Sequence, residues 1–205
     1  MSEKSSIDVP MPIVTPRLIL RAPKESDGQA WYEAKLESYD ELYKWRIWVA
    51  DTPREFLSVG QNQKFCKERM ELFQLREKML LMAFDRHTGK FIGDTGINSP
   101  DWKLRLFRTG YWVRTSEMGK GYATEMAIAV ARYVFLALKA NKLSITHADG
   151  NNASARIIDK VGYEKEGVLR QCHEISDGRV VDEHHYGLLG LDHVPELDVT
   201  WGETR

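Results

Sequence analysis

The sequence predicts a single α/β domain in which a mixed, mostly antiparallel sheet carries helices on both faces. Strand-like stretches alternate with stretches of helical apolar spacing, beginning with a strand at 17–21 and a helix at 23–36. Three strand-like segments later follow one another with no helix between them, which is typical of an antiparallel meander. The chain thus contains strands that follow one another directly and strands that are separated by helices. Together the two kinds of connection favour a mixed sheet.

A chain of 205 residues fits one domain with a substantial core. Its 29 Lys and Arg residues against 30 Asp and Glu residues give a net charge of -1, which argues against a global surface for nucleic acid or an anionic membrane. The polar start and the lack of a long apolar segment predict a cytoplasmic protein. We expect a flexible N-terminus at 1–11, the domain at 12–193, and a tail at 194–205 that is free or contacts a partner.

The first half continues with a helix and the meander. Thr52 and Pro53 combine an N-cap residue with a proline at the first helical position, so we expect a helix at about 53–76. The meander strands are then expected at 79–85, 91–97 and 104–114. A turn at 86–89 and a longer loop at 98–103 connect them.

From Gly121 the apolar spacing becomes helical and continues to about Leu138, which predicts a helix packed on the sheet. A strand at 142–147 and a helix at 153–161 follow, and Gly162 ends that helix. Two last strands are expected at 163–174 and 180–189, joined by a turn at 176–178. The widely spaced Cys66 and Cys172 predict reduced thiols, and the histidines show no metal-ligand spacing.

The segment from Gly110 to Thr124 runs from a strand through a glycine loop into a helix. A helix N-terminus has unpaired N–H groups and partial positive charge, and Gly119 and Gly121 allow a sharp turn, so the segment predicts an anion site. The alternative is a tight turn without a ligand. A P-loop is disfavoured because Lys120 is not followed by Ser or Thr, and a Rossmann fingerprint is disfavoured because no carboxylate follows at the required distance.

Five motifs in register resemble the GNAT superfamily of N-acetyltransferases, and more closely its RimJ/RimL branch of ribosomal-protein N-terminal acetyltransferases. The similarity covers nearly the whole chain. The motifs are Thr15-Pro-Arg-Leu-Ile-Leu-Arg21, the aromatic segment from Leu42 to Trp48, Gly110-Tyr-Trp112, the glycine loop, and Asn151-Asn-Ala-Ser154 followed by Lys160-Val-Gly-Tyr163.

The resemblance implies a GNAT-like sheet of six to seven strands with a splayed central pair, and acetyl-CoA as the cofactor. The strand ending at Val113 would part from the strand at 143–147, the pantetheine would lie in the gap, and a backbone N–H near Val113 would face the thioester carbonyl. The loop from Met118 to Ala123 would hold the pyrophosphate, although the superfamily usually has Arg or Gln at the position of Met118. The implied cofactor-binding set is Trp112, Val113, Met118, Gly119, Lys120, Gly121, Tyr122, Ala123, Thr124, Asn151 and Ser154.

Acetyl transfer to an amine needs a base and a proton for the leaving thiolate. The resemblance places Glu174 near the acceptor as the first choice of base, against the alternative of a solvated surface carboxylate. His173 is second, because regular strand alternation would turn it to the opposite face. Ile158 occupies the position where many members carry an acidic tyrosine. Ser154 then becomes the candidate donor to the sulfur, with helix capping as the alternative and Asn151 or Asn152 as the better N-cap.

The aromatic cluster around 31–48 either lines the acceptor site or belongs to the core, and nearby acidic residues (Glu37, Asp40 and Glu41) are candidates to receive a substrate ammonium. The substrate-binding candidates are Tyr39, Tyr43, Trp45, Trp48, His173 and Glu174.

We expect an acetyl-CoA-dependent N-acetyltransferase that acts by direct attack in a ternary complex, with a protein N-terminal α-amine as acceptor. Alternatives are acetylation of a small amine such as a polyamine, an amino-acid conjugate or an antibiotic, a non-catalytic acyl-CoA-binding module and, more distantly, an NAD-binding domain. No direct nucleic-acid or membrane partner is expected. A homodimer is left open.

Overall fold

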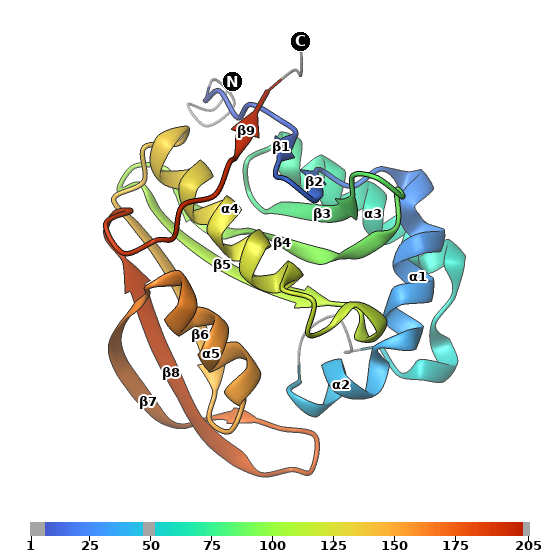
Figure 1. Cartoon of the computed structure of the whole chain (residues 1–205). Coiled ribbons are helices and arrows are strands. Elements are labelled where there is room, and N and C mark those ends of the chain that lie inside the picture. The colour runs from blue at the N-terminus through green and yellow to red at the C-terminus, as the bar shows by residue number, and fades with distance from the viewer. Residues whose placement is uncertain (1–6, 47–51, 203–205) are drawn as a thin grey trace.

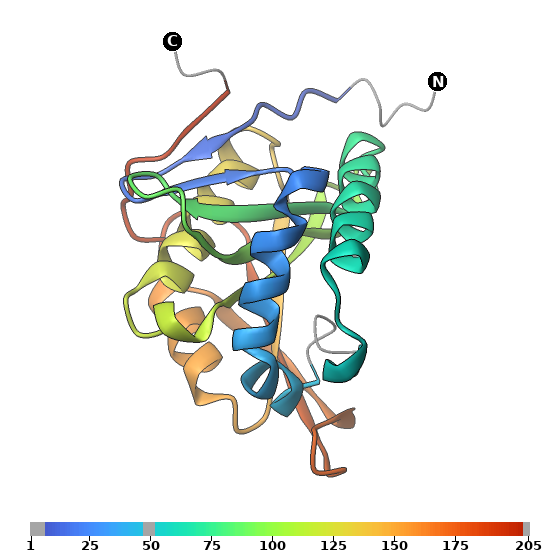
Figure 2. The same cartoon turned by 90° about the vertical axis from the view of Figure 1, so that its right-hand side faces the viewer.

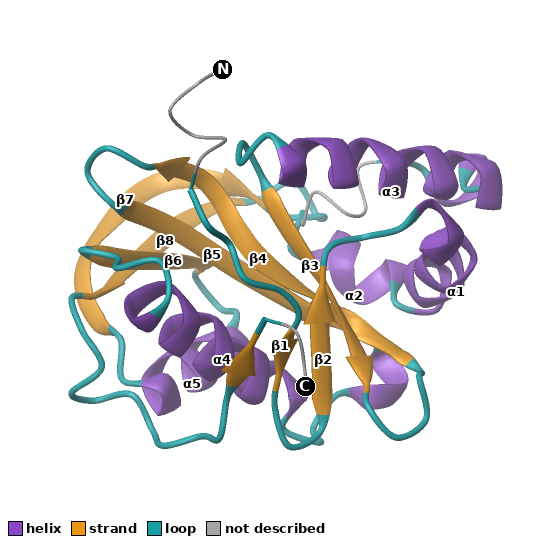
Figure 3. Ribbon diagram, turned by 90° about the horizontal axis from the view of Figure 1, so that it is seen from above, coloured by secondary structure: helices purple, strands orange, loops and turns teal. Residues whose placement is uncertain are grey.

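The computed structural model describes residues 7–46 and 52–202. One twisted sheet separates two groups of helices, as Figures 1 and 3 show. On one face lie α1 (Gly28–Glu37), α2 (Tyr39–Lys44) and α3 (Val59–Gln74), and on the other lie α4 (Tyr122–Leu136) and α5 (Asn152–Val161). The predicted α/β class with helices on both faces is confirmed.

The described residues form a nine-stranded sheet in the order β7-β8-β6-β5-β4-β3-β2-β1-β9. All neighbouring strands are antiparallel except the central pair of β5 and β6. The strands are β1 (Ile13–Val14), β2 (Leu18–Arg21), β3 (Met79–Asp85), β4 (Phe91–Asp101), β5 (Leu106–Val113), β6 (Lys142–Ala148), β7 (Glu164–Glu174), β8 (Val180–Leu188) and β9 (Thr200–Trp201).

The central pair is splayed. Strands β5 and β6 are in register only from Leu106 opposite Lys142 to Arg108 opposite Ser144. Both strands then continue, β5 to Val113 and β6 to Ala148, without pairing to each other. Because β4 still pairs with β5 to its end and β8 with β6 to its end, only the edges facing the gap lack a strand partner.

Two apolar clusters fix the two faces. The larger one packs α4 and α5 on the sheet through fully buried side chains such as Met126 and Val161. The smaller one packs α1 and α3 on the opposite face, where Trp31 contacts Phe65, Phe91 and Trp112. The strand bearing Trp112 is thus held from both sides beyond the point where it parts from β6.

The helix expected at 53–76 is interrupted. A short 3-10 turn, Arg54–Phe56, comes first, and α3 begins only after Ser58, whose hydroxyl accepts a hydrogen bond from the N–H of Gln61 at 3.3 Å. The extended backbone at Leu57 separates the two. Ser58 is therefore the N-cap of the long helix, and Thr52 is not.

Three further expectations were wrong. The segment between α1 and the 3-10 turn, expected as a loop, contains the short helix α2. Strand β4 continues through the loop expected at 98–103 to Asp101. The sheet exceeds six to seven strands because β1 and β9, two residues each, pair at its end.

The described parts of the two terminal segments, residues 7–11 and 194–202, pack on the domain. Val9 near the N-terminus and Val194 near the C-terminus are buried in the larger cluster, and the Trp201 ring lies edge-on to Tyr133 with centroids 5.8 Å apart. Figure 1 shows this C-terminal segment beside α4 and the N-terminal strand. The C-terminal tail is polar, but apolar side chains are spaced along it. The tail thus covers the edge of the sheet that would be open if β1 were the last strand.

Candidate active site

The glycine loop leads into α4 in a left-handed backbone conformation. Gly119 and Gly121 have φ angles of 77° and 84°, a left-handed region that side chains disfavour, and Gly121 is the N-cap of α4. Within the part of the chain that the structure describes, the N–H groups of Gly119 through Thr124 have no hydrogen-bond acceptor. Successive free amides at a helix start form a site for an anion such as phosphate.

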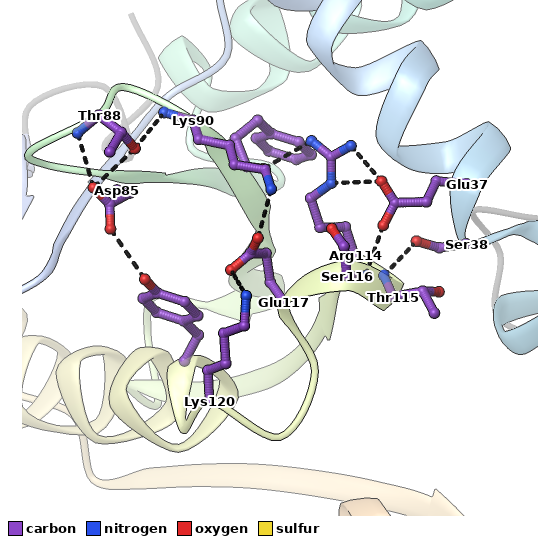
Figure 4. Close-up of polar contacts among 12 residues, drawn as sticks. Glu37, Ser38, Asp85, Thr88, Lys90, Arg114, Thr115, Ser116, Glu117 and Lys120 are labelled. Atoms are coloured by element: carbon purple, nitrogen blue, oxygen red, sulfur yellow. Dashed lines mark hydrogen bonds and ion pairs between the residues drawn. The ribbon is translucent and has the colours of Figure 1, made fainter.

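Carboxylates hold this loop in place, as Figure 4 shows. Glu117 is buried and accepts hydrogen bonds from the ammonium groups of Lys90 at 2.5 Å and Lys120 at 2.9 Å. These bonds lower the pKa of Glu117. The charge of Lys120, one of the residues of the implied cofactor-binding set, is therefore shared with a buried carboxylate.

The end of α1 holds the segment that precedes the loop. Glu37 accepts hydrogen bonds from the guanidinium of Arg114 and from the Ser116 N–H at 2.7 Å, and the Ser38 hydroxyl accepts from the Thr115 N–H at 2.9 Å (Figure 4). Burial raises the pKa of Glu37, but these hydrogen bonds outweigh it and lower the pKa to about 2. Glu37 thus positions the loop and is not open to a substrate ammonium.

The side chain of Trp112 does not face the gap between β5 and β6. It lies in the smaller cluster, and its indole N–H donates to the carboxylate of Asp94. Burial raises the pKa of Asp94 well above its ordinary range. A cofactor in the gap would meet only the backbone of Trp112, so its side chain is removed from the cofactor-binding prediction.

On the face of α4 and α5, the start of α5 approaches β5. The Asn151 side chain caps α5 by accepting from the Ser154 N–H at 3.2 Å, so Ser154 is free of the capping role. The Ser154 hydroxyl instead lies 3.3 Å from the hydroxyl of Tyr111, whose pKa burial raises to about 12. Ile158 is buried in the core. Tyr111 was missed because nothing local to the sequence places it beside α5.

On the other face, the hairpin of β7 and β8 approaches the end of α2. Glu174 forms an ion pair with Arg46 at 2.5 Å, and His173 Nε2 lies 2.9 Å from the carbonyl oxygen of Trp45. The two neighbours therefore reach the same segment, contrary to the expected alternation. A register shift precedes both residues, between Leu169 and His173, where Gln171 adopts a φ of 48°.

Glu183 on β8 lies at the centre of a polar cluster that the sequence analysis did not identify. Its carboxylate oxygens lie 2.9 Å from His185 Nε2, 3.8 Å from His173 Nδ1 and 3.9 Å from Arg108 Nη2. Arg108 also donates to the Thr146 hydroxyl at 2.8 Å, so its side chain crosses from β5 to β6 where the two strands part. No local pattern marks this cluster, because its members come from four strands.

The aromatic residues expected to bind the substrate lie in different environments. Tyr39 is nearly buried and stacks on the more exposed Tyr43, with ring centroids 5.8 Å apart. A Cβ on Gly150 would lie 3.7 Å from the ring of Trp45, so this tryptophan approaches the turn before α5. Trp48 lies outside the described residues. Among residues 7–46 and 52–202, no group of His, Cys, Asp or Glu side chains could hold a metal ion.

Comparison with known proteins decides the family. The model of the acetyltransferase (GNAT) domain matches residues 17–164, well over half of the chain. The chain is a GNAT acetyltransferase.

Two relatives of this GNAT chain are proteins named uncharacterized N-acetyltransferases. Protein p20 of Bacillus licheniformis is 25% identical over 86% of this chain and 95% of its own. YoaA of Bacillus subtilis (strain 168) is 27% identical over 85% of this chain and 94% of its own.

Among solved structures, a RimL ribosomal-protein alpha-N-acetyltransferase in complex with coenzyme A superposes with a TM-score of 0.77. It is 20% identical and covers 86% of this chain and 96% of that one, a likeness that supports the fold.

The GNAT domain is an acyltransferase that uses acetyl-CoA and acts on amines. None of the helices within the described ranges has both the length and the apolar character needed to cross a membrane.

Proposed function

We propose that this GNAT domain acetylates the N-terminal α-amine of a protein, and that this acceptor is a ribosomal protein. The amine would attack bound acetyl-CoA directly. The observation that carries the proposal is the splayed gap of β5 and β6, which has the amide-lined loop and α5 on one face and the polar hairpin on the other. Donor and acceptor would then meet through the gap. The RimL enzyme of similar fold carries an alpha-N-acetyltransferase name, which supports this acceptor class.

On the donor face, the free amides of the loop from Met118 to Thr124 would hold the pyrophosphate. The pantetheine would run along the unpaired edge of β5 toward Val113, whose backbone N–H is our proposed oxyanion donor. The Asn151 side-chain oxygen is engaged in capping, so its NH₂ group is the part left for the pantetheine. The Ser154 hydroxyl, held near Tyr111, would donate to the departing thiolate.

For the base, the geometry favours His173 over Glu174. The Trp45 carbonyl can only accept, so His173 Nε2 must carry the hydrogen, which leaves the lone pair on Nδ1. Nδ1 lies 3.8 Å from the Glu183 carboxylate. The carboxylate of Glu174 is engaged by Arg46 and is half exposed.

A weak base is sufficient for an α-amine. Such an amine, with a pKa of about 7.7 to 8.0, is roughly one-tenth neutral at pH 7, whereas a lysine with a pKa of about 10.4 is neutral in only about one molecule in a few thousand. This difference favours an N-terminal acceptor over a lysine side chain.

The charge of the acceptor side also bears on the small-amine alternative. A cavity of about 540 Å³ lies between α1, α3 and the strands β3 and β4, and Asn98 in its wall is directly opposite Arg108. Lys35, Arg69 and Lys78 line it, and no carboxylate does so among the described residues. Repulsion by a cationic lining grows with the charge of the ligand, so it disfavours a multiply charged polyamine more than a peptide with a single ammonium.

Acceptor profiling tests the function. Purified protein and acetyl-CoA are offered N-terminal peptides, the same peptides with blocked α-amines but free lysines, and polyamines, while thiol release is measured. We expect release only with free α-amines. Equal turnover of the blocked peptides or faster turnover of a polyamine would overturn the proposal.

The site assignments are tested in the same assay. Gly121→Trp should abolish coenzyme A binding, because the indole fills the space of the pyrophosphate. His173→Gln should lower kcat about a hundredfold at neutral pH, and Glu174→Gln only a few-fold. If Glu174→Gln lowers kcat more than His173→Gln does, Glu174 is the base instead.

A further inference from the structure

Two residues of the turn between β1 and β2 reach across to the first turn of α4. The Thr15 hydroxyl donates to Glu125 Oε1 at 2.5 Å, and the Arg17 backbone N–H donates to the same oxygen at 3.1 Å. The Arg17 side chain donates through Nε to Glu125 Oε2 at 2.6 Å. Both oxygens of the buried Glu125 carboxylate thus accept hydrogen bonds from a segment that lies more than a hundred residues earlier in the sequence.

The same arginine touches the glycine loop. Its Nη1 donates to the carbonyl oxygen of Lys120 at 2.9 Å, and its guanidinium lies over the ring of Tyr122 at 4.5 Å. A Cβ built on Gly121 would lie 3.4 Å from Nη2. Arg17 therefore contacts the loop at the residues on both sides of Gly121, and Nη2 lies beside the glycine.

These contacts place Arg17 beside Gly121 as a cationic donor for a phosphate, in addition to Lys120. Met118 carries no charge, and the ammonium of Lys120 is hydrogen-bonded to Glu117. Arg17 has two of its guanidinium nitrogens fixed, by Glu125 and by the Lys120 carbonyl, and is still partly exposed at 42% of its side-chain surface. A guanidinium held in this way loses little conformational freedom when its third nitrogen binds an anion.

We propose that Arg17 is a coenzyme-binding residue, which Glu125 and Thr15 hold so that Nη2 donates a hydrogen bond to the pyrophosphate bound at Gly119 to Gly121. The inference rests on the proposed coenzyme site and adds a side-chain donor to its backbone amides. Charge-assisted hydrogen bonds to phosphate are stronger than neutral ones, so the contact should be measurable in donor affinity.

The experiment compares two acyl donors, acetyl-CoA and S-acetylpantetheine, which lacks all phosphates. In Arg17→Gln we expect the KM for acetyl-CoA to rise about tenfold or more, with kcat and the KM for S-acetylpantetheine unchanged. Arg17→Lys, which keeps the charge, should recover part of the affinity. If Arg17→Gln raises the KM for acetyl-CoA and the KM for S-acetylpantetheine equally, or raises neither, Arg17 only supports the fold.

Acetyl-dephospho-CoA, which keeps the pyrophosphate but lacks the 3′-phosphate, locates the contact. It should show the same KM increase in Arg17→Gln as acetyl-CoA does, and loss of the increase would overturn the pyrophosphate assignment. Arg132→Ala is the matched control, since it removes another arginine–carboxylate pair from α4, with Glu196 at 3.2 Å, far along the helix from the loop. It should leave both KM values unchanged.

Gly121→Trp separates failure of this inference from failure of the coenzyme site. If Gly121→Trp abolishes coenzyme A binding while Arg17→Gln has no effect, the site stands and the role of Arg17 is refuted. If neither variant affects binding, the coenzyme site itself is misplaced.

Discussion

The attachment of α1 to the segment before the glycine loop predicts a pH-dependent contribution of Glu37 to stability. The variant Glu37→Gln keeps the shape of the side chain and removes its charge. The pKa of Glu37 falls from 4.5 to about 2 on folding, and each pKa unit corresponds to about 1.4 kcal/mol, so the ceiling is about 3 kcal/mol. The carboxylate is partly in contact with solvent, which screens its pairing with Arg114, and we expect a loss of about 1–2 kcal/mol in the free energy of unfolding at pH 7.

The sign follows from the direction of the shift. A carboxylate whose pKa is lowered on folding stabilises the protein above its unfolded pKa of 4.5, and this stabilisation disappears as the pH falls toward 2. Urea unfolding of the two proteins at pH 7, 5 and 3 measures it. The difference should be largest at pH 7 and shrink to less than half at about pH 3. Glu41→Gln, an exposed glutamate on α2, is the control and should match the natural protein throughout. A difference that stays constant with pH would refute the electrostatic reasoning.

The remaining predictions concern the leaving thiolate and the C-terminal segment. Ser154→Ala should lower kcat a few-fold with little change in Tm, and Tyr111→Phe should act in the same direction through Ser154; rates unchanged in both would remove the hydroxyl pair from the reaction. Trp201→Ala should lower the free energy of unfolding by about 1–3 kcal/mol, because it removes a ring packed edge-on to Tyr133, whereas loss of an aromatic side chain from a free tail would leave urea unfolding unchanged.

Much of the fold follows from local signals. The strand at Met79–Asp85 and the start of the helix after Gly121 were predicted within a residue, because an apolar run, helical spacing and a glycine mark them. Gly162 ends α5 in the left-handed conformation, as expected. The two-residue strands β1 and β9 have no such signal, since they are too short to show a pattern and β9 pairs with β1 from the far end of the chain.

The interruption of the helix at Leu57 shows a different limit. Both Thr52–Pro53 and Ser58 are plausible helix starts in the sequence. Only the hydrogen bond that the Ser58 hydroxyl accepts identifies the start that is used. Local capping signals therefore narrow the choice of helix start without deciding it.

The donor side of the site was accessible to sequence reasoning because its parts are contiguous: a strand end, a glycine loop and a helix start. Arg17 lies in a motif that the resemblance included, but the motif gave it no role. Glu125 offered one usable signal, since a carboxylate in the first turn of a helix is favoured by the helix dipole. The acceptor side was less accessible, because His173 and Glu174 contact Trp45 and Arg46, which lie more than a hundred residues earlier in the sequence.

Three carboxylates surround a loop whose proposed ligand is an anion, and their arrangement explains why they do not repel it. Glu37, Glu117 and Glu125 are each paired with cationic side chains or backbone N–H groups, so each carries little unbalanced charge. Because their partners lie before, beside and after the glycines, the backbone is fixed on every side, while the amides from Gly119 to Thr124 have no acceptor among the described residues. The attraction for phosphate then comes from fixed peptide dipoles and from the Arg17 guanidinium that Glu125 holds in place.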